Sequence, residues 1–136
     1  MDDVTISTGG CLCARVRYEA RGAGFHATLC HCASCRRAAG APLVAWVSFR
    51  AEEFRVTRGE LTRFRSSPDV ERSFCAACGT QLTYRRDTLP DEIDVTVCSL
   101  DDPSAFPPAD HTWTRMRVAW LQSGDQLPRF AEARTP

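Results

Sequence analysis

Three cysteines lie within six residues of this chain, in the run Cys30-His31-Cys32-Ala33-Ser34-Cys35. Three thiolates at this spacing can surround one soft divalent ion. They leave the fourth corner of its tetrahedron to water, to a distant side chain or to a substrate. A structural zinc ion is closed by four protein ligands, whereas a catalytic zinc ion keeps an open position. The run, here named the cysteine trio (Cys30, Cys32 and Cys35), therefore predicts an open metal site.

Two further cysteine pairs supply the parts of a closed site. Cys11 and Cys13 form a C-x-C pair, and Cys75 and Cys78 form a C-x-x-C pair followed by Gly79. On an extended segment residues i and i+2 face the same side, so the first pair is expected to bind one ion from a strand end. Glycine supplies the positive φ that a C-x-x-C turn often needs. The four sulfurs, here named the cysteine tetrad, would close a loop across the 61 residues between Cys13 and Cys75, which favours a structural metal.

The sequence leaves a second partition of the cysteines open. The two C-x-x-C pairs, Cys32 with Cys35 and Cys75 with Cys78, could bind one ion in a ribbon-like site. The remaining cysteines would then have no metal ion in common. The trio and tetrad are therefore preferred as the two sites. The ribbon-like site would contain Cys32, Cys35, Cys75 and Cys78, and Cys11, Cys13 and Cys30 would lie outside it.

Four other side chains near the cysteines also need an interpretation. Adjacent residues on an extended segment face opposite sides, so His31 is expected to point away from the metal rather than to bind it or carry protons. Cys98 shares the strand parity of polar residues and is interpreted as a thiol without a ligand role. Arg36 and Arg37 follow the trio directly. They can offset the surplus negative charge of three thiolates around a divalent ion, and they can bind a substrate carboxylate.

Composition narrows the class of protein. The chain has 136 residues, which predicts a single domain over residues 1–136. Seventeen basic residues balance seventeen acidic ones, and this absence of a basic surplus argues against a nucleic-acid partner. The sequence shows neither a signal-peptide pattern nor an apolar run of membrane-spanning length, so a cytoplasmic protein without a membrane partner is expected. That compartment keeps thiols reduced, which favours metal binding over disulfides for the eight cysteines.

Short segments with alternating apolar residues predict a mainly β fold with little helix. Strands are expected at 14–20, 43–49, 53–56, 82–84, 92–97 and 117–121, and one short helical turn at 34–40. Segment 43–49 is nearly all apolar, which predicts a strand covered on both faces.

The combination of motifs resembles the glutathione-dependent formaldehyde-activating enzymes, a family that includes the centromere protein V relatives. The resemblance extends over nearly the whole chain. It is carried by Gly10-Cys11-Leu12-Cys13, the segment Cys30 to Arg37, Gly40-Ala41-Pro42, the segment Phe74 to Thr80, the segment Ser99 to Pro103, and Pro108, His111 and Trp120.

The resemblance implies a β-tent fold of small antiparallel sheets held together by zinc, with two zinc ions per chain. The implied ligands are Cys11, Cys13, Cys75 and Cys78 for the structural ion, and Cys30, Cys32 and Cys35 for the open, catalytic ion. The implied partner is glutathione, whose thiol would bind at the free position and add to formaldehyde, a carbon–sulfur lyase step in reverse. Arg36 and Arg37 are candidates to bind its carboxylates. Two alternatives remain: a zinc module that binds glutathione or another thiol without catalysis, and a purely structural double-zinc protein.

Overall fold

The structure is a computed structural model that describes residues 4–135. Residues 1–3 and 136, which the predicted single domain includes, lie outside the described residues. Within the described range, none of the helices is long and apolar enough to cross a membrane. The elements are β1 (Ile6–Gly10), β2 (Arg17–Arg21), β3 (Phe25–Cys30), α1 (Ala33–Ala39), β4 (Val44–Arg50), η1 (Ala51–Glu53), β5 (Phe54–Arg58), β6 (Thr62–Ser67), β7 (Val70–Phe74), β8 (Gln81–Arg86), β9 (Glu92–Thr96), η2 (Val97–Ser99), η3 (Pro103–Ala105), β10 (Asp110–Thr112) and η4 (Thr114–Met116).

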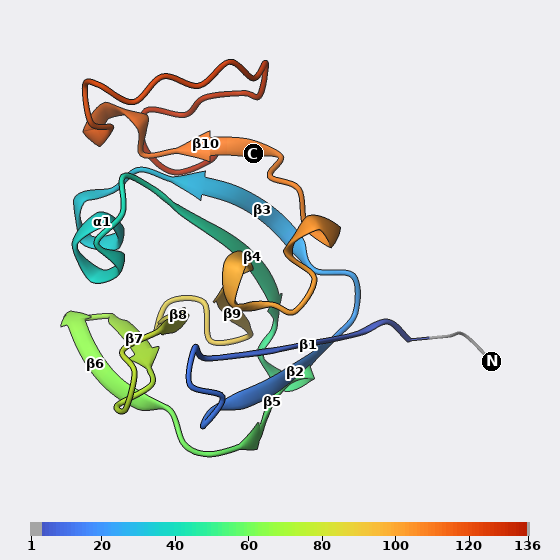
Figure 1. Cartoon of the computed structure of the whole chain (residues 1–136). Helices are drawn as coiled ribbons and strands as arrows, with labels where there is room; N and C mark the ends of the chain where they lie inside the picture. Colours follow the sequence, from blue (N-terminus) through green and yellow to red (C-terminus); the bar gives the residue numbers. More distant parts are fainter. Residues whose placement is uncertain (1–3, 136) are drawn as a thin grey trace.

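The strands form two sheets. The smaller sheet has the order β1-β2-β5, and the larger has the order β10-β3-β4-β9-β8-β7-β6. Neighbouring strands are antiparallel except β10 and β3, which run parallel side by side (Figure 1). The expectation of a mainly β fold of antiparallel sheets with little helix is confirmed, and this one parallel pair is the difference from it.

The main core lies between the two sheets. Tyr18 and Ala20 on β2 pack in one cluster with Val47 and Phe49 on β4 and Val95 on β9. Each of these five side chains is at most 1 % exposed. Burying a side chain of the size of valine or phenylalanine contributes about 1.5–3 kcal/mol, so this face of the larger sheet holds the fold together.

Alternate positions of the same strands form the other face of the larger sheet. Trp46 and Ser48 on β4 lie opposite Thr96 and Asp94 on β9, and Asp94 also lies opposite Tyr84 on β8. Successive side chains of a strand point to opposite faces, so these residues point away from the main core. The prediction that 43–49 is covered on both faces is confirmed, because Trp46 and Ser48 are also buried.

The β1–β2 hairpin is joined to the segment after β9 by specific contacts. Arg17 binds the carboxylate of Asp101, and the hydroxyls of Tyr18 and Ser99 lie 2.7 Å apart. A Cβ on Gly9 would come within 2.5 Å of the Ser99 carbonyl oxygen and the Tyr18 hydroxyl. Gly9 therefore permits a close approach of backbone to backbone that a larger residue would prevent.

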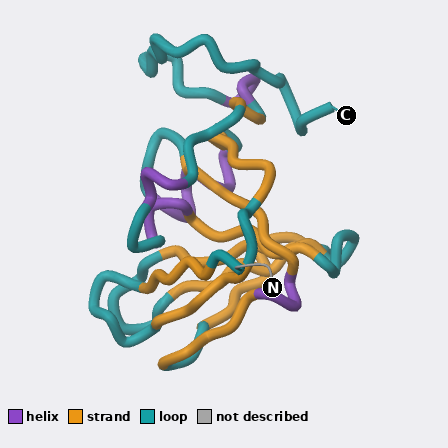
Figure 2. Tube along the Cα trace, turned by 90° about the vertical axis from the view of Figure 1, so that its right-hand side faces the viewer, coloured by secondary structure: helices purple, strands orange, loops and turns teal. Residues whose placement is uncertain are grey.

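Two sequence-based expectations about elements have clear outcomes. The expected helical turn at 34–40 is α1, which ends at Gly40 in the left-handed conformation. The expected strand at 117–121 is wrong: the N–H of Leu121 donates to the carbonyl of Val118 and closes a turn. Figure 2 shows the chain beyond β10 as a long segment mostly in loop conformation at one end of the molecule.

Candidate metal centres and the adjoining cavity

The cysteine trio is assembled by the junction between β3 and α1. Cys30 ends β3, Cys32 is the N-cap of α1, and Cys35 lies in its first turn. The N–H of Cys35 donates to the Cys32 sulfur at 3.3 Å, which satisfies one free amide at the start of the helix. The three sulfurs all lie within 4.8 Å of one another, and the trio can therefore hold a metal ion.

The electrostatics of the trio favour a bound cation. Hydrogen bonds from the thiols of Cys30 and then Cys35 lower the pKa of Cys32 to about 2. The pKa of Cys30 is raised, first by its hydrogen bond to Cys32 and then by Cys35 and burial. Three thiolates this close repel one another, and a bound cation would favour the ionised form of all three. Three soft sulfur donors fit zinc and disfavour magnesium or calcium.

A buried arginine that the sequence analysis did not select lies against the trio. Arg72 on β7 is 5 % exposed, and its two terminal nitrogens lie 3.6 and 3.7 Å from the Cys35 sulfur. Its Nε donates to Ser66 at 3.1 Å, and its guanidinium lies 5.0 Å from the centre of the Tyr84 ring. Arg72 therefore offsets negative charge on the trio, the role that the sequence analysis gave to Arg36 and Arg37.

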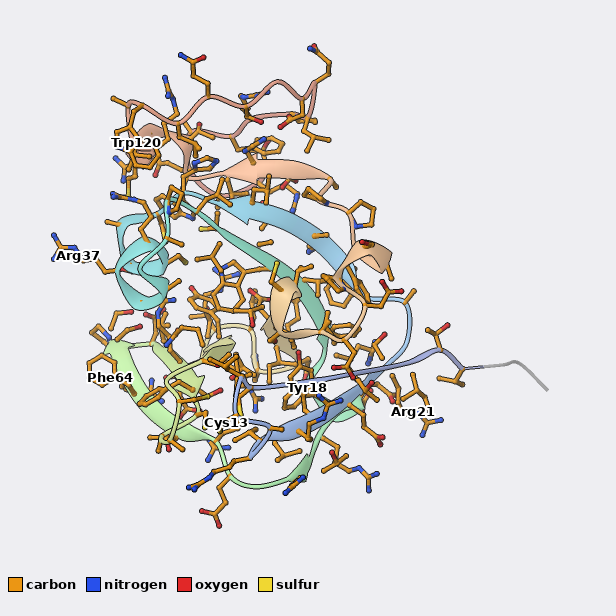
Figure 3. All side chains as sticks on the ribbon, in the orientation of Figure 1. Cys13, Tyr18, Arg21, Arg37, Phe64 and Trp120 are labelled. Atoms are coloured by element: carbon orange, nitrogen blue, oxygen red, sulfur yellow. The ribbon has the colours of Figure 1, made fainter. Side chains whose placement is uncertain are left out.

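The cysteine tetrad joins the turns of two hairpins. Cys11 and Cys13 lie in the turn between β1 and β2, where Figure 3 labels Cys13, and Cys75 and Cys78 lie in the turn between β7 and β8. The four sulfurs lie within 4.8 Å of one another, so they too can hold a metal ion. Because β1–β2 belongs to the smaller sheet and β7–β8 to the larger, an ion in the tetrad would connect the two sheets.

The first of these turns differs from the extended C-x-C segment that was expected. The N–H of Ala14 donates to the carbonyl of Cys11 at 3.1 Å, and Ala14 has a positive φ of 65°. Cys11 and Cys13 therefore converge because the chain turns, with their sulfurs 3.6 Å apart, and the expectation of strand alternation at this pair is wrong.

The second turn follows its expectation. Gly79 has a φ of 80°, and its N–H donates to the carbonyl of Cys75 at 2.8 Å. The sulfur of Cys78 lies 3.3 Å from the hydroxyl of Thr80. That hydroxyl, followed by backbone amides, lowers the pKa of Cys78 to about 5, which favours the thiolate form that metals bind.

A cavity of about 610 Å³ opens beside the trio. All three trio cysteines line it, whereas none of the tetrad cysteines does. Its walls include the aromatic side chains of Trp46, Tyr84 and Trp113. Cavities of 300–1,000 Å³ with largely apolar walls are typical of small-molecule sites.

The same cavity carries charged groups on the larger sheet. Arg86, Glu92 and Asp94 line it, together with His26 and Ser48. The hydroxyl of Ser48 donates to Asp94 at 2.6 Å. Burial raises the pKa of Asp94, and the hydrogen bond from Ser48 partly opposes that rise. The cavity therefore offers both signs of charge in addition to the sulfurs of the trio.

His31 points away from the trio, as expected. It is 3 % exposed, and its Nε2 lies 2.8 Å from Nδ1 of His111, whose own Nε2 lies 3.0 Å from a carboxylate oxygen of Asp125. The Asp125 carboxylate accepts from Nε2 of His111, and a neutral His111 then accepts from His31 at Nδ1. These hydrogen bonds connect His31, which lies between two trio cysteines, to Asp125 in the C-terminal segment.

The other predicted side chains lie outside the cavity wall. Arg36 donates from Nε to the carbonyl of His31 at 3.3 Å, and Arg37 is exposed and extends away from α1 in Figure 3. Neither lines the cavity. Cys98 lies in η2, is exposed, and belongs to neither cysteine cluster, in agreement with its interpretation as a thiol without a ligand role.

Comparison with known proteins identifies the family of this chain. Residues 6–116 match the family described as glutathione-dependent formaldehyde-activating enzyme. This chain belongs to that family. Among solved structures, the chain is similar to a Rhodobacter sphaeroides protein, with 30 % sequence identity and a TM-score of 0.59. The similarity covers 69 % of this chain and 87 % of that one. No curated protein matches this chain.

Proposed function

We propose that this protein is a zinc-dependent enzyme of the carbon–sulfur lyase type that acts on the adduct of glutathione and formaldehyde or on a related thiol adduct. One observation carries the proposal: the trio opens on a cavity large enough for a small peptide, whereas the tetrad does not. The family is associated with glutathione-dependent formaldehyde activation, which supports the same substrate pair. A protein that uses glutathione is expected in the cytoplasm, where thiols are kept reduced.

Both clusters would hold zinc. In a reducing compartment, four sulfurs at tetrahedral spacing are the usual ligands of a structural zinc ion, and three sulfurs leave one position for a substrate. Zinc at the trio would act as a Lewis acid and lower the pKa of a thiol that reaches its free position. The residues of the two sites would be Cys11, Cys13, Cys75 and Cys78, and Cys30, Cys32 and Cys35.

The proposed reaction balances without a redox partner. The glutathione thiol loses its proton, its sulfur forms a bond to the carbonyl carbon of formaldehyde, and the carbonyl oxygen gains a proton. The product is S-(hydroxymethyl)glutathione, and the reverse step breaks the carbon–sulfur bond. In this scheme Arg72 offsets charge on the trio, while Trp46, Tyr84 and Trp113 exclude water from part of the cavity.

The rate of adduct formation tests this proposal. Protein of known zinc content should form S-(hydroxymethyl)glutathione faster than the spontaneous reaction at equal concentrations of glutathione and formaldehyde, as measured by NMR exchange. Cys32→Ser should remove the acceleration, and Cys98→Ser, an exposed cysteine in neither cluster, should keep it. Thiol binding without acceleration would instead favour a non-catalytic zinc module. One zinc ion per folded wild-type chain would favour the ribbon-like partition.

A further inference from the structure

The charged groups of the cavity are brought together by the register of the larger sheet. Asp94 on β9 lies between Ser48 on β4 and Tyr84 on β8, directly opposite both. Arg86 and Glu92 are each two residues along from this row, and side chains two residues apart on a strand share a face. All five side chains line the cavity. The charged groups at this end of the cavity therefore come from strands of the larger sheet.

This charged end lies at a distance from the trio that suits a peptide. On β4, Val44 is opposite Cys30 and Ser48 is four residues further along. At the rise of an extended strand, those four residues span about 13 Å. An extended tripeptide covers about 10 Å before its side chains are counted. A peptide-sized thiol with its sulfur at the trio therefore has the length to approach Ser48 and Asp94.

The charges at this end are available to a ligand. Asp94 accepts one hydrogen bond, from Ser48. Among the described residues, neither Asp94 nor Arg86 forms an ion pair within 4.0 Å. The other two arginines of the wall are already engaged: Arg134 with Asp110, and Arg72 with the trio. An incoming carboxylate therefore has Arg86 as its partner at this end, and an incoming ammonium has Asp94.

We propose that this end of the cavity binds the α-amino-acid head group of the thiol substrate, with Asp94 on its ammonium and Arg86 on its carboxylate. The proposal rests on the proposed function, because it takes the sulfur of the same substrate to lie at the trio. Glu92, beside Arg86, adds a second negative charge that favours the ammonium. Glutathione carries such a head group on its γ-glutamyl residue, at the end of an arm that extends from the thiol-bearing residue.

The burial of Asp94 agrees with a binding role. Its pKa is raised, so its ionised form is disfavoured in the free protein, and folding is less stable once the pH exceeds the ordinary pKa of about 3.9. Asp94 lowers stability and forms one hydrogen bond, so its presence in the cavity wall is explained better by binding of a cationic ligand group than by a contribution to packing. Asp94→Asn is accordingly expected to fold with an unchanged or higher melting temperature.

Paired ligands test the proposal directly. Zinc-loaded protein would be titrated calorimetrically with glutathione and with N-acetylglutathione, which lacks the ammonium. A charge-assisted hydrogen bond is worth about 1.5–3 kcal/mol, so wild type should bind N-acetylglutathione about 10- to 100-fold more weakly. Asp94→Asn should weaken glutathione binding by a similar factor and leave N-acetylglutathione binding unchanged. Asp87→Asn, the same change at an exposed carboxylate paired with Arg65, should change neither affinity.

The outcomes separate this proposal from the proposed function. Equal affinity of wild type for both thiols, or an equal loss for both in Asp94→Asn, would overturn the head-group site even if adduct formation is accelerated. If Asp94→Asn loses affinity for glutathione alone, and wild type does not accelerate adduct formation, the result would support the head-group site and count against catalysis.

The carboxylate partner is tested in the same way. Arg86→Gln should weaken glutathione binding. A glutathione derivative amidated at the γ-glutamyl α-carboxylate should bind this variant no more weakly than glutathione does.

Discussion

The two cysteine clusters use the same ligand atom but differ in origin and surroundings. The tetrad takes its sulfurs from two hairpin turns that belong to different sheets, and it lies away from the cavity. The trio takes its sulfurs from one junction of six residues, and all of them line the cavity wall. Ligand type alone therefore does not separate a structural metal site from a reactive one. The number of sulfurs and the space next to them do.

Serine substitutions in the two clusters should have the most unequal effects. Cys75→Ser removes a ligand that is 2 % exposed from the site joining the sheets, and it should lower the free energy of unfolding by more than about 4 kcal/mol. Cys32→Ser should lower it by less than about 2 kcal/mol and reduce zinc from two ions per chain to one. Chemical denaturation and metal analysis measure both. Equal destabilisation by the two variants would argue for two structural sites.

Removal of the buried guanidinium should affect the trio and leave the tetrad intact. Arg72→Met takes away the cation beside Cys35, and residues next to metal ligands typically change metal affinity about 10- to 100-fold. Competition with a chelator should therefore show weaker binding of one of the two zinc ions. The matched control is Arg65→Met on neighbouring β6, whose exposed pair with Asp87 is screened by solvent and lies away from the trio. A trio affinity unchanged in Arg72→Met would contradict the role given to that residue.

The hydrogen-bond chain behind the trio should show a characteristic pH dependence. A hydrogen bond from Ser123, followed by those from Leu127 and His111, holds the pKa of Asp125 below its usual range. A lowered folded pKa adds stability above the ordinary value of about 3.9, and that stability is lost as the pH falls below it. Asp125→Asn should therefore melt below wild type at pH 6, and the difference should shrink below pH 4. A difference independent of pH would show that the charge of Asp125 is irrelevant.

The smallest effect is expected at Arg37. Its side chain is exposed and outside the cavity wall, so Arg37→Ala should leave glutathione affinity within about twofold and stability within about 0.5 kcal/mol. The sequence-based prediction that Arg36 and Arg37 bind glutathione carboxylates stays open to this measurement. A large rise in KM for glutathione in Arg37→Ala would restore that prediction.

The cysteine clusters could be predicted from sequence because metal ligands have local spacing rules. C-x-C and C-x-x-C pairs restrict which sulfurs can converge, and the trio and tetrad of the structure match that partition. Apolar alternation likewise located β2, β5 and β9, since strands with one buried face have period two, and a short, nearly all-apolar run located β4. The strand at 117–121 was wrong because a short apolar stretch without a pairing partner carries no information about the turn that forms there.

Arg72 could not be selected in the same way. Nothing in the residues around it distinguishes it from the other arginines of the chain, and its contact with Cys35 joins β7 to α1, two elements far apart in the sequence. The turn at Cys75 and Cys78 belongs to the β7–β8 hairpin, but counting outward from Phe74 and Gln81 would place Arg72 opposite Thr83, and a register shift between Ser73 and Phe74 places it opposite Tyr84 instead. Asp94 alternates with the apolar residues Ile93 and Val95 in the sequence, but that its face of the strand forms a cavity wall depends on contacts between distant segments.

The bridging of two sheets by hairpin turns far apart in sequence also sets an order of assembly during synthesis. At about 5–20 residues per second, the ribosome adds Cys75 about 3 to 12 s after Cys13. Once Cys35 has been added, 22 residues after Cys13, the nascent chain carries the complete trio, whereas the tetrad still has half of its sulfurs. The first metal ion is therefore expected to bind at the trio. The β1–β2 hairpin can be joined to the larger sheet through the tetrad only after Cys75 and Cys78 have left the exit tunnel.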